Sequence, residues 1–197
     1  MSWLALELYE RGMVRVGWFK LSSGLESPFY IDLRRLYMHP NLARRVAMEI
    51  VERVGLDDVD VVLGVATGGL PLASYISCIT GKPLAYVRSE RKNHGLSSLI
   101  EGDVAGLRIL VVDDVSTTGS SIARAVSAVR EAGGIPLKAS VVVDREQGAS
   151  STLAKLGVKL YWLITAREIF EELHKHGLIS EREYKDIMNY LKQHAVG

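Results

Sequence analysis

The sequence of 197 residues predicts an α/β fold in which a central, mostly parallel sheet is flanked by helices. Two observations carry this prediction. Apolar, β-branched runs alternate along the chain with segments of helical periodicity, which is typical of a parallel sheet with helices on its faces. The interior runs, such as RILVVDD at 108–114, are almost continuously apolar, as expected for strands that are buried on both faces.

The first 39 residues do not follow this alternation. A short helix is predicted there, followed by WFKLSSGLESPFYIDLRRLY at 18–37, which is rich in aromatic and turn residues. Residues 1–39 are therefore expected to form a small separate N-terminal element. The core is expected to span residues 40–165, and residues 166–197 are expected to form two closing helices.

Within the core, β-branched runs predict strands at about 59–65, 84–87, 107–113, 137–144 and 158–163. Helical periodicity predicts a helix at 40–54 and another at 119–132, where Gly133 and Gly134 end the pattern. The last helix is predicted at 180–193, because Ser180 followed by Glu183 is a capping-box pattern.

Two stretches need a specific interpretation. The uncharged run 61–81 is long enough to span a bilayer, but Thr67, Gly68, Gly69 and Pro71 divide it into a strand and a helix. Residues 88–104 are polar and longer than a typical connection, which predicts a mobile loop or an extended hairpin. Long loops of this kind often carry function.

Composition excludes several classes of protein. Lys and Arg number 24 against 23 Asp and Glu, so the net charge of +1 supplies no general attraction to nucleic acid or membranes. The single cysteine, Cys78, cannot form an internal disulfide, which fits a reducing compartment. The N-terminus lacks a basic segment leading into an apolar core, so no signal peptide is expected. These features predict a cytoplasmic protein with no nucleic-acid or membrane partner.

The most informative string is LVVDDVSTTGSS at 110–121, where a buried strand ends in two acids and a hydroxyl-rich turn opens a helix. Backbone N–H groups, hydroxyls and the helix dipole converge there, which indicates an anion site such as a phosphate. Asp113 and Asp114 would repel a phosphate unless they face sugar hydroxyls or act through a divalent cation. A phosphorylated sugar satisfies both requirements. The alternative, an ordinary capped helix, accounts for one acid but not for the whole run.

This string resembles the ribose-phosphate signature of the type I phosphoribosyltransferases, which implies a type I phosphoribosyltransferase fold with a small N-terminal hood. These enzymes bind 5-phosphoribosyl 1-diphosphate (PRPP). By this resemblance Asp113 and Asp114 hold the ribose hydroxyls, and the following loop surrounds the 5-phosphate. The loop residues so implied are Val115, Ser116, Thr117, Thr118, Gly119, Ser120 and Ser121.

Two further segments match the same family. GVATGG at 64–69 resembles its diphosphate loop, which places Thr67 and Gly68 beside PRPP, although alone this string would equally indicate a tight turn. YVRSERKNHG at 86–95 resembles its mobile flap, which implies that Arg88, Lys92 and His94 bind the leaving diphosphate. Alone, the flap segment would indicate a solvated run of charge. Lys92, His94, Asp113 and Asp114 are the implied catalytic residues.

LSSGLESPFYIDLR at 21–34 and VDREQGA at 143–149 resemble, in order and spacing, the orotate phosphoribosyltransferases of this family. The resemblance implies that Arg145 binds the carboxylate of orotate and that Thr117 bonds the pyrimidine. It also implies that the backbone at Tyr30 and Ile31 covers the ring. From the residues alone, Arg145 is equally explained as half of a structural ion pair with Asp144 or Glu146.

The chain departs from the family pattern at two positions. Ser22 in the hood and Ser89 in the flap stand where many members have lysine. The family's flap lysine reaches into the active site of the partner subunit of a homodimer. Arg91 lies two positions later and would point the same way if the loop is extended, so it is the candidate substitute.

The implied reaction is displacement of diphosphate from PRPP by orotate to give orotidine 5'-monophosphate in pyrimidine biosynthesis. Magnesium is the implied cofactor and is carried by PRPP, so no residue is assigned as a direct metal ligand. Two alternatives remain. A non-catalytic PRPP-sensing regulator is disfavoured because no basic stripe or added helix-turn-helix is present. A purine phosphoribosyltransferase is disfavoured because a purine would leave Arg145 buried and unpaired.

Overall fold

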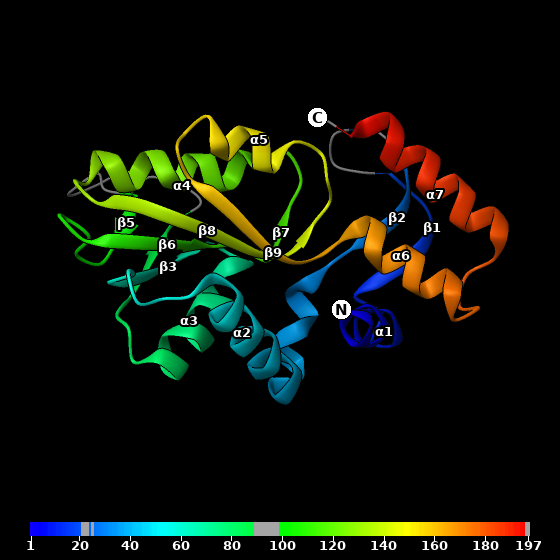
Figure 1. The fold of residues 1–197 in the computed structure, drawn as a ribbon, viewed down its shortest axis with the longest axis horizontal. Helices are drawn as coiled ribbons and strands as arrows, with labels where there is room; N and C mark the ends of the chain where they lie inside the picture. Colours follow the sequence, from blue (N-terminus) through cyan, green and yellow to red (C-terminus); the bar gives the residue numbers. More distant parts are fainter. Residues whose placement is uncertain (21–23, 25, 89–98, 196–197) are drawn as a thin grey trace.

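The computed structural model describes residues 1–20, 24, 26–88 and 99–195. Figure 1 shows a sheet with helices on both faces and, beside it, a smaller lobe that contains both ends of the chain. The sheet order is β5-β4-β3-β6-β8-β7, with β9 also paired to β8. Its strands are β3 (Val61–Val65), β4 (Leu84–Val87), β5 (Ile100–Glu101), β6 (Arg108–Val112), β7 (Val115–Ser116), β8 (Ile135–Asp144) and β9 (Lys159–Thr165).

The expected mostly parallel sheet is confirmed. All pairings in it are parallel except that of β4 with β5. The five predicted strands match β3, β4, β6, β8 and β9 with bounds shifted by at most two residues. Every residue of β3 is buried, as the continuously apolar run predicts for an interior strand.

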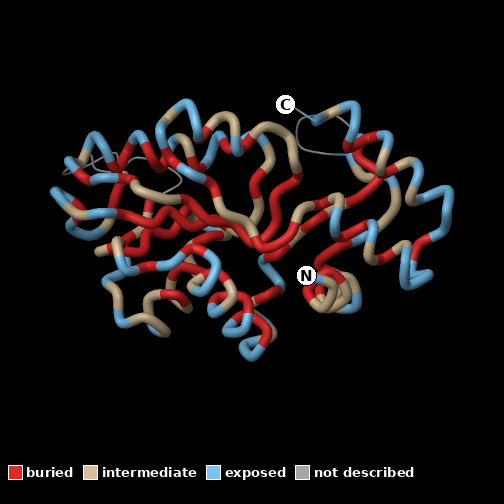
Figure 2. Tube along the Cα trace, viewed as in Figure 1, coloured by how far each residue is buried: buried red, intermediate tan, exposed pale blue. Residues whose placement is uncertain are grey.

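Helices cover both faces of the sheet (Figure 1). On one face lie α2 (Pro40–Val54) and α3 (Gly69–Thr80), and on the other lie α4 (Ser120–Glu131) and α5 (Ala149–Ala154). Alternate residues of each strand point to opposite faces, so Val62 and Leu110 pack with α2 and α3, whereas Leu63 and Val111 pack with α4. The central strands are mostly buried (Figure 2). The core therefore consists of two apolar layers separated by the sheet.

The smaller lobe joins segments from opposite ends of the chain. It contains α1 (Ser2–Glu10), the antiparallel strands β1 (Val14–Lys20) and β2 (Glu26–Ile31), the 3-10 helix η1 (Leu33–Met38), α6 (Ala166–Lys175) and α7 (Glu181–His194). The ring of Phe29 in β2 lies 4.8 Å from that of Phe170 and 5.7 Å from that of Tyr190. The hood therefore shares its core with the closing helices. From the sequence, residues 1–39 and the closing helices were expected to be separate parts of the chain.

Replacing Phe29 by Ala is expected to lower the free energy of unfolding by about 3–5 kcal/mol, because a fully buried aromatic ring would leave a cavity between β2, α6 and α7. Chemical denaturation measures this change. Trp18→Ala is the matched control, since Trp18 lies on the same hairpin and is 64% exposed. A loss for Phe29→Ala as small as the control's would show that the lobe has no common core.

The long connection begins as a hairpin. β4 pairs with β5 in antiparallel register, and the Arg88 N–H donates to the carbonyl of Leu99 at 2.9 Å. This confirms the extended-hairpin alternative at its base. Ser89, Arg91, Lys92 and His94 lie outside the described residues, as does Ser22 in the hood.

The uncharged run 61–81 divides into β3 and α3, as its glycines predict. Across the described part of the chain, no helix combines the length and apolarity needed to cross a bilayer.

Candidate active site

The predicted site segments meet at one edge of the sheet. β3, β6 and β8 are parallel, so their carboxyl ends lie together, and ligands of open α/β sheets bind at this edge. The 66–68 loop follows β3, Asp113 and Asp114 follow β6, and Arg145 follows β8. In Figure 1 this edge faces the smaller lobe.

The loop between β6 and α4 forms a small pocket of about 80 Å³. Gly119 precedes α4 with φ of 78°, and a Cβ there would lie 3.0 Å from the Cα of Ala149, so this close approach requires glycine. The N-terminal end of α4 thus opens into the pocket with its unpaired N–H groups, which favours an anion. The pocket is lined by Asp113, Val115, Ser116, Thr117, Thr118, Gly119, Ser120, Ser121 and Ile122.

Buried Asp113, which lines this pocket, and half-buried Asp114 form a pair of acids. The Asp114 N–H donates to Oδ1 of Asp113 at 3.0 Å, and the Val115 N–H donates to Oδ1 of Asp114 at 2.9 Å. Burial raises the pKa of both carboxyls, and the charge of Asp114 raises the pKa of Asp113 further. Hydroxyl donors or positive charge on a ligand would stabilise the ionised pair, and a ribose supplies such hydroxyls.

The loop after β3 lies directly against the acids. A Cβ on Gly68 would come within 2.5 Å of Oδ2 of Asp114, and one on Gly69 within 2.7 Å of the Cα of Asp113. The hydroxyl of Tyr37 donates to the carbonyl of Gly68 at 2.9 Å. The peptide between Ala66 and Thr67 is cis. Gly68 and Gly69 therefore lie directly against the acid pair, and Thr67 precedes them in the same loop.

Arg145 is a buried cation that pairs with no anion among the residues that the structure describes. Its side chain lies over the Phe29 ring at 4.8 Å, and neither Nε nor Nη2 has a hydrogen-bond partner. Burial lowers the pKa of its guanidinium. Its backbone N–H donates to the carbonyl of Ser116 at 2.9 Å, so Arg145 lies between the phosphate loop and the hood.

The structure contradicts the alternative that Arg145 forms an ion pair with Asp144 or Glu146. Asp144 accepts a hydrogen bond from the hydroxyl of Ser116, and Glu146 lies 3.5 Å from Nε of Arg167. A buried guanidinium is expected to have a bidentate anionic partner, and a ligand carboxylate matches that geometry.

The structure describes some of the other implied residues. β2 carries Tyr30 and Ile31 directly after Phe29, whose ring lies under the Arg145 side chain. Arg88 forms an ion pair with Glu101 at 3.4 Å at the base of the β4–β5 hairpin. Lys92 and His94 fall outside the described residues, and the structure gives no geometry for them.

Three features of the site were missed from the sequence. Tyr37 holds the loop at Gly68, Asp144 bonds Ser116, and Arg34 makes a bidentate ion pair with Asp32, with N–O distances of 2.8 and 2.7 Å. The Asp32–Arg34 pair is local, and its i,i+2 spacing was the one available signal. Tyr37 and Asp144 contact residues 31 and 28 positions away, which no local pattern indicates.

Within the described ranges, no group of three or more His, Cys, Asp or Glu side chains is arranged to hold a metal. Asp113, which lines the pocket, and the adjacent Asp114 offer carboxylate oxygens. Magnesium is commonly bound through one or two carboxylates together with substrate phosphates, so this pair fits a magnesium ion that arrives with a phosphorylated substrate.

Comparison with known proteins agrees with this geometry. Residues 33–156 match the family described as phosphoribosyl transferase domain. The chain is 44% identical to orotate phosphoribosyltransferase of Sulfolobus acidocaldarius over 184 residues, 93% of each chain. The crystal structure of orotate phosphoribosyltransferase from Aeropyrum pernix superposes with TM-score 0.79 and 43% identity, covering 90% of this chain and 99% of that one.

UMP synthase of Leishmania donovani superposes with TM-score 0.87 and 34% identity, covering 98% of this chain but 42% of that longer one. The match to the family extends over most of this chain, including the loop at 110–121 and the segment at 143–149. The chain belongs to the orotate phosphoribosyltransferases of the type I phosphoribosyltransferase family.

Proposed function

We propose that this protein is an enzyme that transfers the phosphoribosyl group of PRPP to orotate, giving orotidine 5'-monophosphate and diphosphate in pyrimidine biosynthesis. The relatives named for this activity support the proposal. One observation carries it: Arg145 is buried beside the phosphate loop, and its Nε and Nη2 have no hydrogen-bond partner in the described part of the chain. A guanidinium binds a carboxylate bidentately, and orotate is a pyrimidine that bears a carboxylate.

Different described residues bind different parts of the two substrates. The loop from Val115 to Ser121 and the N-terminal end of α4 bind the 5-phosphate, while Asp113 and Asp114 accept hydrogen bonds from the ribose hydroxyls. Thr117 bonds the pyrimidine, and the backbone at Tyr30 and Ile31 covers its ring. This arrangement holds the ring nitrogen of orotate near the anomeric carbon, and such positioning supplies a large part of the rate.

The reaction breaks the bond between the anomeric carbon and the diphosphate oxygen and forms a carbon–nitrogen bond to orotate. The ribose becomes oxocarbenium-like while negative charge grows on the diphosphate, so electrostatic stabilisation dominates. The acid pair lies on the side where positive charge develops. Orotate enters partly as its ring anion, so no general base is assigned. Magnesium, when bound with PRPP, would neutralise charge on the diphosphate.

The leaving diphosphate would be bound by backbone at Thr67 and Gly68 and by the flap residues Arg88, Lys92 and His94. To bind the diphosphate, Arg88 must break its ion pair with Glu101. A closed flap would exclude water and protect PRPP from hydrolysis. His94 is able to pass a proton.

We also propose that the enzyme is a cytoplasmic homodimer in which the flap reaches the neighbouring active site. With Ser89 in place of the usual flap lysine, Arg91 would supply the missing cation. The proposal is supported by the family resemblance and by the single cysteine, which suits a reducing compartment.

The proposal is tested by the absorbance change on mixing the protein with PRPP, Mg²⁺ and orotate, with adenine, guanine, xanthine and uracil in parallel. Turnover of orotate alone is expected. Turnover of a purine would overturn the role of Arg145 while keeping the fold. No turnover with any base, together with tight PRPP binding, would favour a PRPP-sensing regulator.

Replacing Gly69 by Ala is expected to weaken PRPP binding about tenfold or more and to lower stability by about 1–3 kcal/mol. The added methyl group would overlap the backbone at Val112 and Asp113 and push the diphosphate loop away from the acids. Calorimetric titration with PRPP and a denaturation curve measure the two effects.

Gly81→Ala is the control for this variant. Gly81 ends α3 in open space with φ of 68°, so alanine should lower stability by about 1 kcal/mol and leave PRPP binding unchanged. If Gly69→Ala binds PRPP as tightly as the control, the loop does not contact the diphosphate.

A further inference from the structure

Asp144 is a buried carboxylate that the reaction described above does not use. It ends β8 and is 5% exposed. Its Oδ1 accepts two hydrogen bonds, one from the hydroxyl of Ser116 at 2.8 Å and one from the Glu146 N–H at 3.2 Å. Ser116 belongs to the phosphate loop, and Glu146 follows the base-binding Arg145. One oxygen atom therefore joins the two halves of the site.

Further contacts join the same two segments. β7 consists only of Val115 and Ser116, and Ser116 lies opposite Asp144 in the pairing of β7 with β8. The Arg145 N–H donates to the carbonyl of Ser116. The backbones at Gly119 and Ala149 also approach so closely that a Cβ on Gly119 would lie 3.0 Å from the Cα of Ala149. The phosphate loop and the base-binding segment are thus packed together.

We propose that Asp144 is a positioning residue that couples the phosphate loop to Arg145, so that filling the 5-phosphate site tightens binding of orotate. This inference rests on the proposed function. A phosphate in the loop orders Ser116, whose hydroxyl holds Asp144. The ordered Asp144 in turn fixes the backbone on both sides of the Arg145 side chain. The entropy cost of ordering the site is then smaller for the second ligand, so the affinities for the phosphate and for orotate raise each other.

The contact at Asp144 requires an oxygen atom that accepts hydrogen bonds, but it does not require the negative charge of the carboxylate. Both hydrogen bonds end on the same oxygen, so the amide oxygen of asparagine can accept both of them. Asp144 also borders an open pocket of about 480 Å³ that includes Trp162 and Thr165, where the amide nitrogen of asparagine can be hydrated. Asparagine should therefore preserve the coupling, whereas alanine removes the acceptor and leaves two donors without a partner.

The test is calorimetric titration of orotate into the full chain, with and without ribose 5-phosphate, which fills the phosphate loop but carries no leaving group. Ribose 5-phosphate is expected to lower the Kd of the wild-type protein for orotate about fivefold or more. The ratio of the Kd for orotate without ribose 5-phosphate to the Kd with it measures the coupling. In Asp144→Ala this ratio should fall to about one, and the Kd for orotate should rise about tenfold. Asp144→Asn should retain the ratio and stay within about threefold of wild type.

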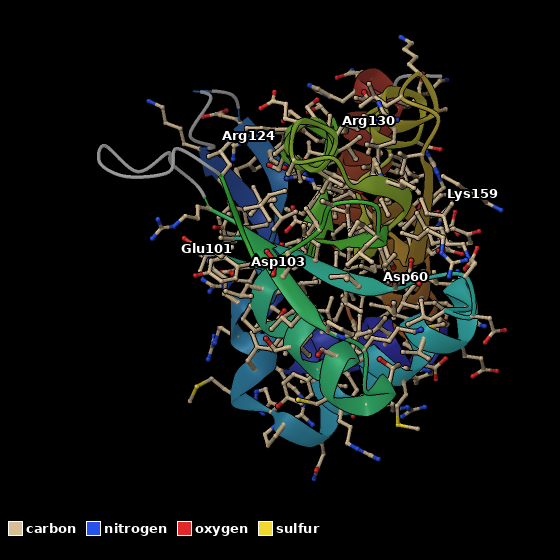
Figure 3. The ribbon with its side chains drawn as sticks, turned by 90° about the vertical axis from the view of Figure 1, so that its left-hand side faces the viewer. Asp60, Glu101, Asp103, Arg124, Arg130 and Lys159 are labelled. Atoms are coloured by element: carbon tan, nitrogen blue, oxygen red, sulfur yellow. The ribbon has the colours of Figure 1, made fainter. Side chains whose placement is uncertain are left out.

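Asp60→Ala is the matched control. Asp60 accepts bonds from the Arg108 backbone N–H and from its Nε and Nη2, so its loss removes a comparable set of contacts. Figure 3 looks onto the end of the molecule where Asp60 and Lys159 lie. Asp60 directly precedes β3 and Lys159 begins β9, so both lie at the opposite ends of these strands from the site. Asp60→Ala should lower the Tm but change neither the Kd for orotate nor the ratio.

Several results would overturn the coupling while leaving the enzyme activity established. They are a wild-type ratio of one, an Asp144→Ala variant that keeps the wild-type ratio, or an Asp144→Asn variant that loses it as fully as alanine does. If the wild-type protein turns over orotate with PRPP and any of these results is obtained, the coupling is overturned and the proposed function stands. A wild-type protein that neither binds nor turns over orotate overturns the proposed function and the coupling together.

Discussion

Replacing Asp114 by Asn is expected to lower kcat/KM for PRPP by about 10²- to 10³-fold. The carboxylate would lie where the ribose develops positive charge, and the neutral amide removes that stabilisation while keeping an oxygen that can accept the Val115 N–H. Initial rates at saturating orotate measure the loss. Cys78→Ala, which changes an exposed residue of α3, should leave turnover nearly unchanged.

The Asp114→Asn variant is expected to have a higher Tm than wild type at neutral pH. Burial raises the pKa of the Asp114 carboxyl in the folded state, so ionised Asp114 destabilises that state above this raised pKa. The gain from asparagine should disappear as the pH falls through the folded and then the unfolded pKa, because aspartate is then protonated in both states. A stable variant with wild-type turnover would remove the acid pair from the catalytic centre.

Replacing Arg145 by Ala is expected to raise the KM for orotate about 10²-fold or more and to change the KM for PRPP much less. The guanidinium would make a buried, charged contact with the substrate carboxylate, and the loss of one partner of such a contact is costly. Steady-state kinetics with each substrate varied in turn measure the split.

Arg145→Lys should recover only part of this affinity, because an ammonium group does not reproduce the bidentate fork. The free Arg145→Ala protein should be at least as stable as wild type, because the substitution removes a buried cation whose Nε and Nη2 lack partners. Equal increases in the KM values for orotate and PRPP would instead show that Arg145 has a structural role.

The parallel core was predictable because its signals are local. The apolar run before Asp113 predicts β6, and the hydroxyl-rich turn after it predicts the N-terminal end of α4. The capping box of Ser180 and Glu183 predicts the start of α7, and both of its hydrogen bonds are present. β7 and α5 were missed because they contain only two and six residues and carry no periodicity.

Local sequence patterns were enough to predict the main strands and helices along the chain and the loop that forms the phosphate pocket, since neighbouring residues supply both. The long-range contacts became visible only in the folded chain: Phe29 packs with Phe170 and under Arg145, Tyr37 holds Gly68, and Asp144 joins the two halves of the site. These contacts join residues far apart in the chain. They depend on how complete elements pack together, which hydrophobic periodicity and turn chemistry do not encode.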